Sequence, residues 1–94
     1  MQKVIVTRHK ALIDLLKKRG LADDSTPVLA HASLEDVRDK HVIGVLPLSL
    51  AAAAAMVTEI PLKLTPELRG KELDIDTLRE IAGDPVTYMV SRVS

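Results

Sequence analysis

Apolar and polar positions in the first third of the chain follow two different periods. Residues 3–6 include a β-branched run that is apolar on both faces, which is typical of a buried parallel strand. Leucines then recur at helical spacing through residues 10–19, and Gly20 fits the C-terminal cap of this helix. Turn-forming residues occupy 23–27, and a short second strand follows at 28–30. The pattern therefore predicts a strand, a helix and a strand, in that order.

Capping and breaking residues mark the next elements. Ser33 followed by Asp36 resembles a capping box, which predicts a brief helix over residues 34–38. Residues 41–46 form a third apolar run of strand type, and Pro47 cannot continue its hydrogen-bond ladder. We therefore expect a third strand that ends at this proline.

An alanine-rich helix is predicted after the proline. Ser49 is placed to cap a helix over residues 50–57, the middle of which is alanine. Short alanine side chains allow a helix to lie close to a sheet. We therefore interpret residues 51–55 as a close-packed surface and not as a functional segment.

A fourth strand is predicted at residues 59–64, near a sheet edge because it contains a proline. Thr65 and Pro66 fit the cap and first position of a short helical turn that stops at Gly70. A last helix begins at Asp74 or Asp76 and runs to Gly83.

Residues 85–90 complete the pattern as a final strand. Strands thus alternate with helices, an order typical of a parallel sheet. We expect an α/β fold: a small Rossmann-like three-layer domain with a mostly parallel sheet of four to five strands, covering residues 1–94 as a single domain. Neither GxGxxG nor GxxxxGK[ST] occurs, so the fold class implies neither a dinucleotide nor ATP.

Length and charge limit the classes of function. A chain of 94 residues builds a real but thin core, so burial against a second copy is expected. Lysine plus arginine equals aspartate plus glutamate at 13 each, so no global field draws the protein onto DNA or an anionic membrane. The longest uncharged stretch, 42–58, is shorter than a membrane-spanning helix, and no signal peptide pattern opens the chain. We expect a soluble protein of the cytoplasm.

Two kinds of residue are scarce. The chain has no cysteine, which excludes disulfides, a thiolate nucleophile and zinc sites of the cysteine type. Tyr88 is the only aromatic residue, whereas general binders of single-stranded nucleic acid stack bases on several rings. We therefore expect no general binding of DNA or RNA, and any anion site must be local.

Polar residues recur where the predicted strands end. In open α/β sheets, ligands bind in the crevice outside the carboxyl ends of the strands, and helix N-termini there favour anions. Arg8 and Ser49, each just before a predicted helix, are placed to hold phosphate oxygens, although each polar residue here could also merely cap a helix or solvate a turn. The residues at these strand ends are Thr7, Arg8, His9, His31, Ser33, Pro47, Ser49, Lys63, Thr65, Arg69 and Lys71.

The spacing of the histidines and serines does not favour a metal site or acyl transfer. His9 and His31 show neither HxxxH nor HxH spacing, so we expect no metal site. A triad of Ser49, His9 and an aspartate lacks the G-x-S-x-G elbow that would support acyl transfer. His41 is expected at the surface or partly buried, without a functional role.

Three segments carry a resemblance to a known family. They are "VTRHKALIDLL", "HVIGVLPLSLAAA" and "IPLKLTPELRGKEL", in this order along nearly the whole chain. Together they resemble the small CRISPR-associated Csx proteins, specifically the sixteenth of that series. That family accompanies type III CRISPR systems and is similar to the ring nucleases, which degrade cyclic oligoadenylate second messengers, chiefly the tetra-adenylate. The resemblance thus implies a CARF-like fold and a ring nuclease.

The resemblance also implies a set of site residues. The implied catalytic residues are His9, Arg8 and Ser49. His9 would be the first candidate for general acid or base, and Arg8 or Arg69 would stabilise charge on the phosphoryl oxygens. Ser49 would stand where family members often have histidine. Val45 is a second departure, at a position where members often have threonine. The implied substrate-binding residues are Thr7, Arg8, His9, Leu46, Pro47, Ser49, Arg69 and Gly70.

The implied reaction needs no metal and no cofactor. A ribose 2′-hydroxyl brought in line with the neighbouring phosphorus displaces the 5′-oxygen and leaves a 2′,3′-cyclic phosphate. A ring with two-fold symmetry also suits a homodimer whose two copies present the same surface to one ligand. Two alternatives stay open: a module that binds cyclic oligoadenylate without cutting it, and a dimeric interaction protein.

Overall fold

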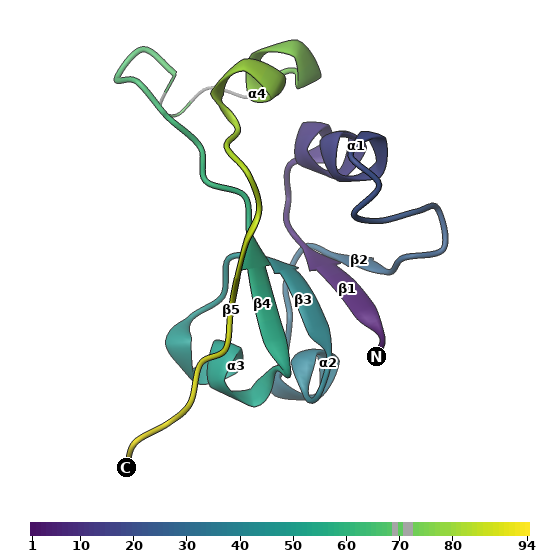
Figure 1. Ribbon diagram of the computed structural model, residues 1–94, viewed down its shortest axis with the longest axis vertical. Helices are drawn as coiled ribbons and strands as arrows, with labels where there is room; N and C mark the ends of the chain where they lie inside the picture. Colours follow the sequence, from purple (N-terminus) through teal and green to yellow (C-terminus); the bar gives the residue numbers. More distant parts are fainter. Residues whose placement is uncertain (69, 71–72) are drawn as a thin grey trace.

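The computed structural model describes residues 1–68, 70 and 73–94. Helices and strands alternate along these residues, as the pattern predicts (Figure 1). The elements are β1 (Lys3–Val6), α1 (Lys10–Lys18), β2 (Val28–Leu29), α2 (Leu34–Val37), β3 (His41–Gly44), α3 (Leu48–Ala53), β4 (Met56–Glu59), α4 (Ile75–Ile81) and β5 (Val86–Tyr88).

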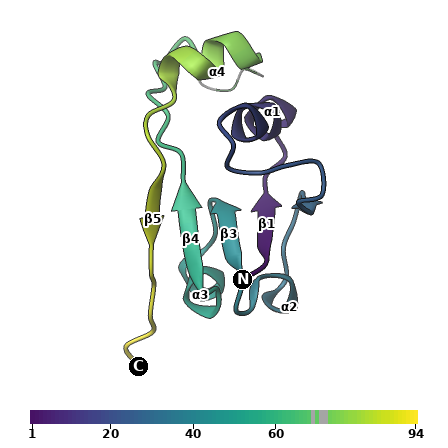
Figure 2. The ribbon, with the colours of Figure 1, turned by 45° about the vertical axis from the view of Figure 1, so that its right-hand side comes forward.

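In the described part of the chain, the strands form one five-stranded sheet in the order β2-β1-β3-β4-β5. Strands β1 to β4 are parallel to one another, and β5 runs antiparallel to β4. This confirms the prediction of a small α/β domain with a mostly parallel sheet. Figure 2 shows α1 and α4 at the carboxyl ends of the parallel strands, and α2 and α3 at their amino ends.

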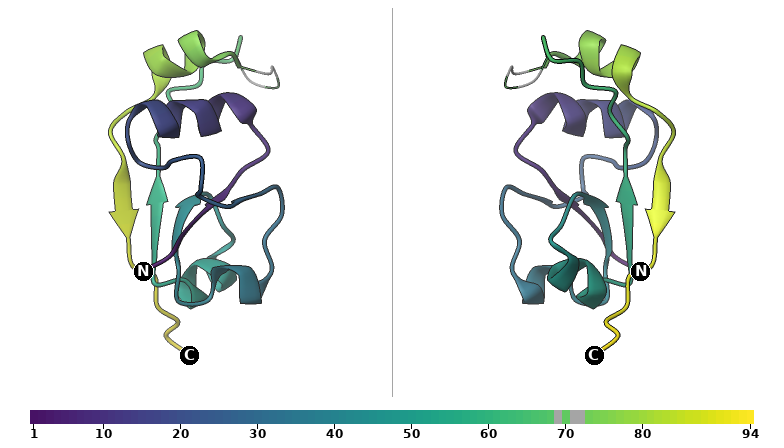
Figure 3. Two further views of the ribbon diagram at one scale, coloured as in Figure 1. Left: turned by 90° about the vertical axis from the view of Figure 1, so that its right-hand side faces the viewer. Right: turned by 90° about the vertical axis from the view of Figure 1, so that its left-hand side faces the viewer.

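The core lies on both faces of this sheet. Val4 and Val42 point to the face covered by α2 and α3, whereas Ile5 and Ile43 point to the face covered by α1. Successive strand residues face opposite sides, and both sets are buried, which explains why β1 and β3 are apolar without alternation. Burying one such side chain contributes about 1.5–3 kcal/mol. The two views of Figure 3 show α1 and α4 at one end of the strands and α2 and α3 at the other.

Two helix starts form as the sequence predicts. At α2, the Asp36 carboxylate accepts hydrogen bonds from the Ser33 backbone N–H at 2.8 Å and from the Ser33 hydroxyl at 2.9 Å. At α4, the Asp74 carboxylate accepts from the Thr77 N–H at 2.8 Å. These bonds satisfy donors that a helix start otherwise leaves free.

The alanine segment is shorter as a helix than the sequence predicts. Helix α3 begins at Leu48, with Pro47 at its N-cap, and the chain becomes extended at Ala54 (φ −71°, ψ 155°). Ser49 therefore lies in the first turn and does not cap the helix. Ala51 and Ala54 are 5% and 8% exposed within the core, which confirms the interpretation of close packing.

The predictions of a helix to residue 57 and of a fourth strand at 59–64 are wrong. The fourth strand comes earlier, at β4, because Val57 and Thr58 pair with β3 and bury their side chains to 6% and 3% exposure. Within the predicted 59–64 segment, Leu62 makes an isolated bridge to Ala82. The third strand likewise ends at Gly44 and not at residue 46.

A partly buried chain of polar side chains links three strands on the α1 face of the sheet. His41 Nε2 lies 2.6 Å from the Thr58 hydroxyl, which lies 2.8 Å from the Thr87 hydroxyl. Burial lowers the pKa of His41, and the nearby charge of Lys3 lowers it further. The partly buried position expected for His41 is confirmed, and its ring also ties β3 to β4.

Helix α4 packs on α1 at the carboxyl end of the sheet (Figure 1). The Arg19 guanidinium, just after α1, donates hydrogen bonds to the carbonyl of Gly83 at 2.7 Å and to that of Ala82 at 3.4 Å. The C-terminal end of α1 is thus joined to the segment that leads into β5.

Candidate functional site

A pocket of about 440 Å³ opens at the carboxyl ends of β1 and β3. Thr7, Arg8 and His9 reach it from the end of β1, and Gly44 and Val45 from the end of β3. Its apolar lining consists of Val6, Leu12, Ala30, Ile43, Ile60 and Leu62. The structure thus brings the first polar group of the sequence to the crevice where α/β sheets hold ligands.

The floor of the pocket depends on Gly44. Its φ is +144°, a conformation that L side chains rarely adopt, and a Cβ at this position would lie 2.2 Å from the Val6 carbonyl oxygen. Glycine therefore lets the backbones of β1 and β3 stay close at the point where both turn into the pocket rim.

The turn after β1 orients the polar side chains. The Thr7 hydroxyl accepts a hydrogen bond from the His9 N–H at 3.1 Å, which fixes the turn between β1 and α1. His9 is the N-cap residue of α1, but its ring does not cap the helix. The imidazole is exposed beside the pocket and is available to a ligand.

Electrostatics at this end of α1 favour an anion. The first turn of α1 contains no acidic residue, and among the described residues Arg8 forms no ion pair. A helix N-terminus carries a partial positive charge, and its first N–H groups lack partners within the helix. The arginine and the helix end therefore add their charges at one rim of the pocket.

The remaining predicted site residues lie elsewhere. Leu46 is half-buried in the core on the α2 and α3 face, and Pro47 and Ser49 are exposed at the start of α3. None of these three lines the pocket, because α3 packs on the opposite face of the sheet from α1. Gly70 lies in an exposed turn outside the lining, and Arg69 falls outside the described residues.

The aliphatic walls are the part of the site that residue-level reasoning missed. Ile60 and Leu62 come from the segment after β4, and Leu12 from α1. The sequence signal that could have indicated these residues is the "IPL" at 60–62, which lies in one of the segments that carry the family resemblance. These side chains make part of the pocket lining apolar.

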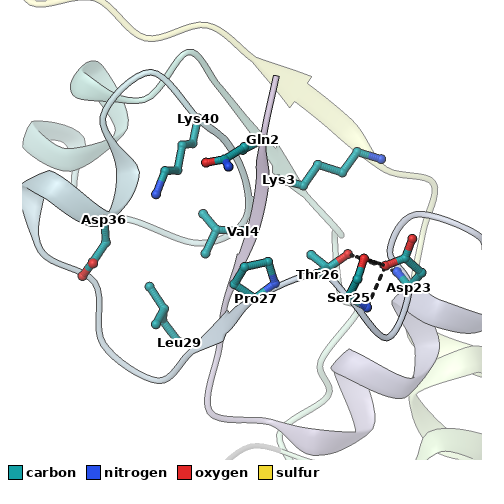
Figure 4. Close-up of a pocket in the computed structure, with 10 residues that line it drawn as sticks. All are labelled: Gln2, Lys3, Val4, Asp23, Ser25, Thr26, Pro27, Leu29, Asp36 and Lys40. Atoms are coloured by element: carbon teal, nitrogen blue, oxygen red, sulfur yellow. Dashed lines mark hydrogen bonds between the residues drawn. The ribbon is translucent and has the colours of Figure 1, made fainter.

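A second pocket, of about 530 Å³, lies near the amino ends of β1 and β3 (Figure 4). Its carboxylates are already engaged. Asp36 holds Ser33, and Asp23 accepts bonds from the Ser25 hydroxyl at 2.5 Å and N–H at 2.9 Å. These bonds lower the pKa of both aspartates. The lining residues are Gln2, Lys3, Val4, Asp23, Ser25, Thr26, Pro27, Leu29, Asp36 and Lys40. The bonded aspartates serve turns and caps, so we favour the first pocket as the functional site.

The described residues hold neither a cluster of metal ligands nor a helix that could span a membrane. Over residues 1–68, 70 and 73–94, no three histidine, cysteine, aspartate or glutamate side chains gather where a metal ion could be held. In the same residues, no helix has the length and apolar character needed to cross a bilayer.

Comparison with known proteins gives one match. Residues 4–91 match the model of the family described as "Putative CRISPR-associated protein (Cas_VVA1548)". Since the match covers most of the chain, the protein belongs to this CRISPR-associated family. Neither the curated proteins nor the solved structures gave a match.

Proposed function

We propose that the protein is a ring nuclease of the Csx type, the sixteenth of that series, acting on cyclic oligoadenylate in type III CRISPR defence. The observation that carries the proposal is the pocket at the carboxyl ends of β1 and β3. Its rim brings Arg8, His9 and the N-terminus of α1 together beside apolar walls. Membership of a CRISPR-associated family supports a role in CRISPR defence.

The two sides of the pocket match the two parts of a nucleotide. Phosphate oxygens bind at the cationic rim, where a guanidinium donates two parallel hydrogen bonds. Adenine bases lie against the aliphatic walls, Ile60 and Leu62 among them, because none of the described residues that line the pocket is aromatic. Most of the affinity then comes from phosphate and ribose contacts.

The proposed reaction is an internal transfer at phosphorus. The ribose 2′-oxygen forms a bond to the adjacent phosphorus, and the bond from phosphorus to the 5′-oxygen breaks. His9 accepts the proton of the 2′-hydroxyl and returns a proton to the departing 5′-oxygen, because an imidazole can act both as a general base and as a general acid. Arg8 stabilises the charge that grows on the phosphoryl oxygens. The products are a 2′,3′-cyclic phosphate and a 5′-hydroxyl.

The contribution of Ser49 is smaller than the resemblance implies. Its hydroxyl lies on α3, outside the pocket lining of its own chain. We therefore assign the proton transfer to His9, and Arg69 is kept from the resemblance as a further phosphate ligand.

We also propose that two copies share one ring across a two-fold axis. Val45, which lines the pocket, and Leu48, three residues later, are 74% and 77% exposed. A second copy that covers these side chains would bring a second cationic rim to the same ligand. The proposed substrate is cyclic tetra-adenylate, which has the matching two-fold symmetry.

One assay tests these proposals. The protein is incubated with labelled cyclic tetra-adenylate in EDTA, and the products are separated on denaturing and native gels. Cleavage to a product with a 2′,3′-cyclic phosphate supports the ring nuclease. Lys18→Ala removes a cation at the opposite end of α1 from Arg8. It is the matched control for Arg8→Ala and should cleave at the unchanged rate.

A second candidate function is binding without cleavage. Ser49 and Val45 stand where related Csx proteins often have histidine and threonine, and this departure favours a module that sequesters the nucleotide. A shifted complex on the native gel, with intact ligand on the denaturing gel, would identify this function. If the gels show no cleavage and no shifted complex, both candidate functions are refuted, and the dimeric interaction protein remains.

A further inference from the structure

The outer edge of β5 has no partner strand among the described residues. β5 pairs with β4 along one side, and the sheet ends there. Figure 2 shows the C-terminal segment continuing along the sheet edge and then beyond the body of the molecule. An edge strand exposes a row of backbone donors and acceptors that can pair with another chain. The opposite edge, β2, is only two residues long.

The usual protection of such an edge is weak here. Natural proteins place charged residues, bulges or prolines on exposed edge strands. Pro85 precedes β5, but residues 85–91 contain no charged residue. Val86, Tyr88 and Met89 are 39%, 49% and 84% exposed, and Tyr88 is the only aromatic residue of the chain. This edge is therefore suited to being covered.

The sequence of the edge is complementary to itself. Residues 84–92 read DPVTYMVSR, with an acid at one end, a base at the other and no charge between them. When two copies of this segment pair antiparallel about Tyr88, Asp84 of each copy lies opposite Arg92 of the other. The same register places Val86 opposite Val90. A shift of one or two residues in either direction separates both charge pairs.

The end residues are free to form these pairs. Both Asp84 and Arg92 are exposed, and among the described residues neither takes part in an ion pair. The Arg92 Nε donates to the carbonyl of Ser94. Pairing with β4 ends at Tyr88, so the stretch after it is the part that a second copy would support.

We propose that the protein self-associates through β5, with two copies of residues 84–92 paired antiparallel about Tyr88 into one sheet that spans both copies. Opposite charges and apolar cross-strand pairs are the contacts that stabilise such a ladder. In this arrangement β3 of one copy runs antiparallel to β3 of the other. The two pockets then open at opposite ends of the shared sheet, so this contact is separate from the proposed sharing of a ring.

Charge reversal tests the energetics of this contact. The variants Asp84→Arg and Arg92→Asp each place like charges opposite one another twice per dimer. Each should weaken self-association, measured by analytical ultracentrifugation without ligand, by about tenfold or more. An equimolar mixture of the two variants restores opposite charges at both ends and should associate like the wild type. Glu80→Arg, at an exposed position of α4, changes the net charge by the same amount as Asp84→Arg and serves as the control.

A cysteine substitution tests the register. The chain has no cysteine, so Tyr88→Cys should form a disulfide-linked dimer on oxidation, because the residue lies opposite itself. Ser91→Cys should not, because its two copies are about 20 Å apart along the ladder. The proposal is overturned if both charge variants associate as the wild type does, if their mixture is no stronger than its components, or if the two cysteine variants cross-link equally. None of these outcomes bears on cleavage of cyclic tetra-adenylate.

Discussion

Replacement of Gly44 by alanine tests the account of the pocket floor. A Cβ at this position would lie 2.2 Å from the Val6 carbonyl oxygen, whereas real Cβ contacts are essentially never closer than 3.0 Å. The two backbones must therefore separate by close to 1 Å at the carboxyl end of the parallel ladder between β1 and β3. The residue also holds φ at +144°, and such glycine-only conformations cost other residues about 1–3 kcal/mol.

The structure offers a control that separates these two costs. Gly20 also has a positive φ, +76°, but a Cβ there meets nothing within 4 Å. Gly20→Ala therefore carries only the conformational cost, about 1–2 kcal/mol. Gly44→Ala adds the clash, and overpacking of this kind typically costs a further 1–3 kcal/mol. We expect Gly44→Ala to lower the free energy of unfolding by about 3 kcal/mol or more.

Urea unfolding followed by far-ultraviolet circular dichroism measures both variants on the same scale. A loss of about 3 kcal/mol is a large fraction of the 5–15 kcal/mol typical of a small domain, so the midpoint should move clearly. Equal losses for Gly44→Ala and Gly20→Ala would show that β1 and β3 do not approach closely at the pocket floor. In that case the explanation of the glycine would be wrong.

Three further predictions concern pH, catalysis and salt. The pKa of His41 is lowered by burial, so the folded protein binds this proton less readily than the unfolded chain; the contribution of His41 to stability should be level above pH 6.5 and fall as the pH drops below it. His41→Gln should flatten thermal unfolding midpoints between pH 5 and 6.5, taken as the rough window for histidine, and an unchanged slope would refute this origin. In ring cleavage assays, Arg8→Ala should weaken both binding and turnover, whereas His9→Ala should lower turnover by roughly 10²–10⁴-fold with little change in binding; wild-type turnover in His9→Ala would make the imidazole structural. Binding of the ring should weaken steeply between low and high salt in fluorescence titrations, because phosphate contacts dominate, and tight binding at all salt concentrations would contradict the cationic rim.

Several helices and strands could be predicted from local patterns in the sequence. The bonds between Ser33 and Asp36 and the cap at Asp74 involve residues three apart, so the sequence alone specifies them. The buried run of β1 and the leucine spacing of α1 are equally local. The position of Thr7, Arg8 and His9 followed from the general rule for the carboxyl ends of parallel strands.

The misplaced elements depend on long-range contacts. Alanine favours a helix, but Met56–Glu59 gains more by pairing with β3, and a local propensity cannot show that gain. Once β4 begins early, Ile60 and Leu62 enter the pocket and not a strand. Ser49 looked like a site residue from its place in the chain, yet its helix packs on the other face of the sheet.

The bonds from Arg19 to Gly83 and Ala82 have a consequence for local unfolding. Among the helices and strands, α4 packs chiefly on α1, so α4 can separate while β1, β3 and β4 keep their ladder. Amide protons of α4 should therefore exchange with solvent through a smaller opening than those of β3. The same opening would release the C-terminal end of α1, the helix whose other end carries His9. The stability of α4 and the order of the pocket rim are thus linked through the packing of α4 on α1 and through Arg19.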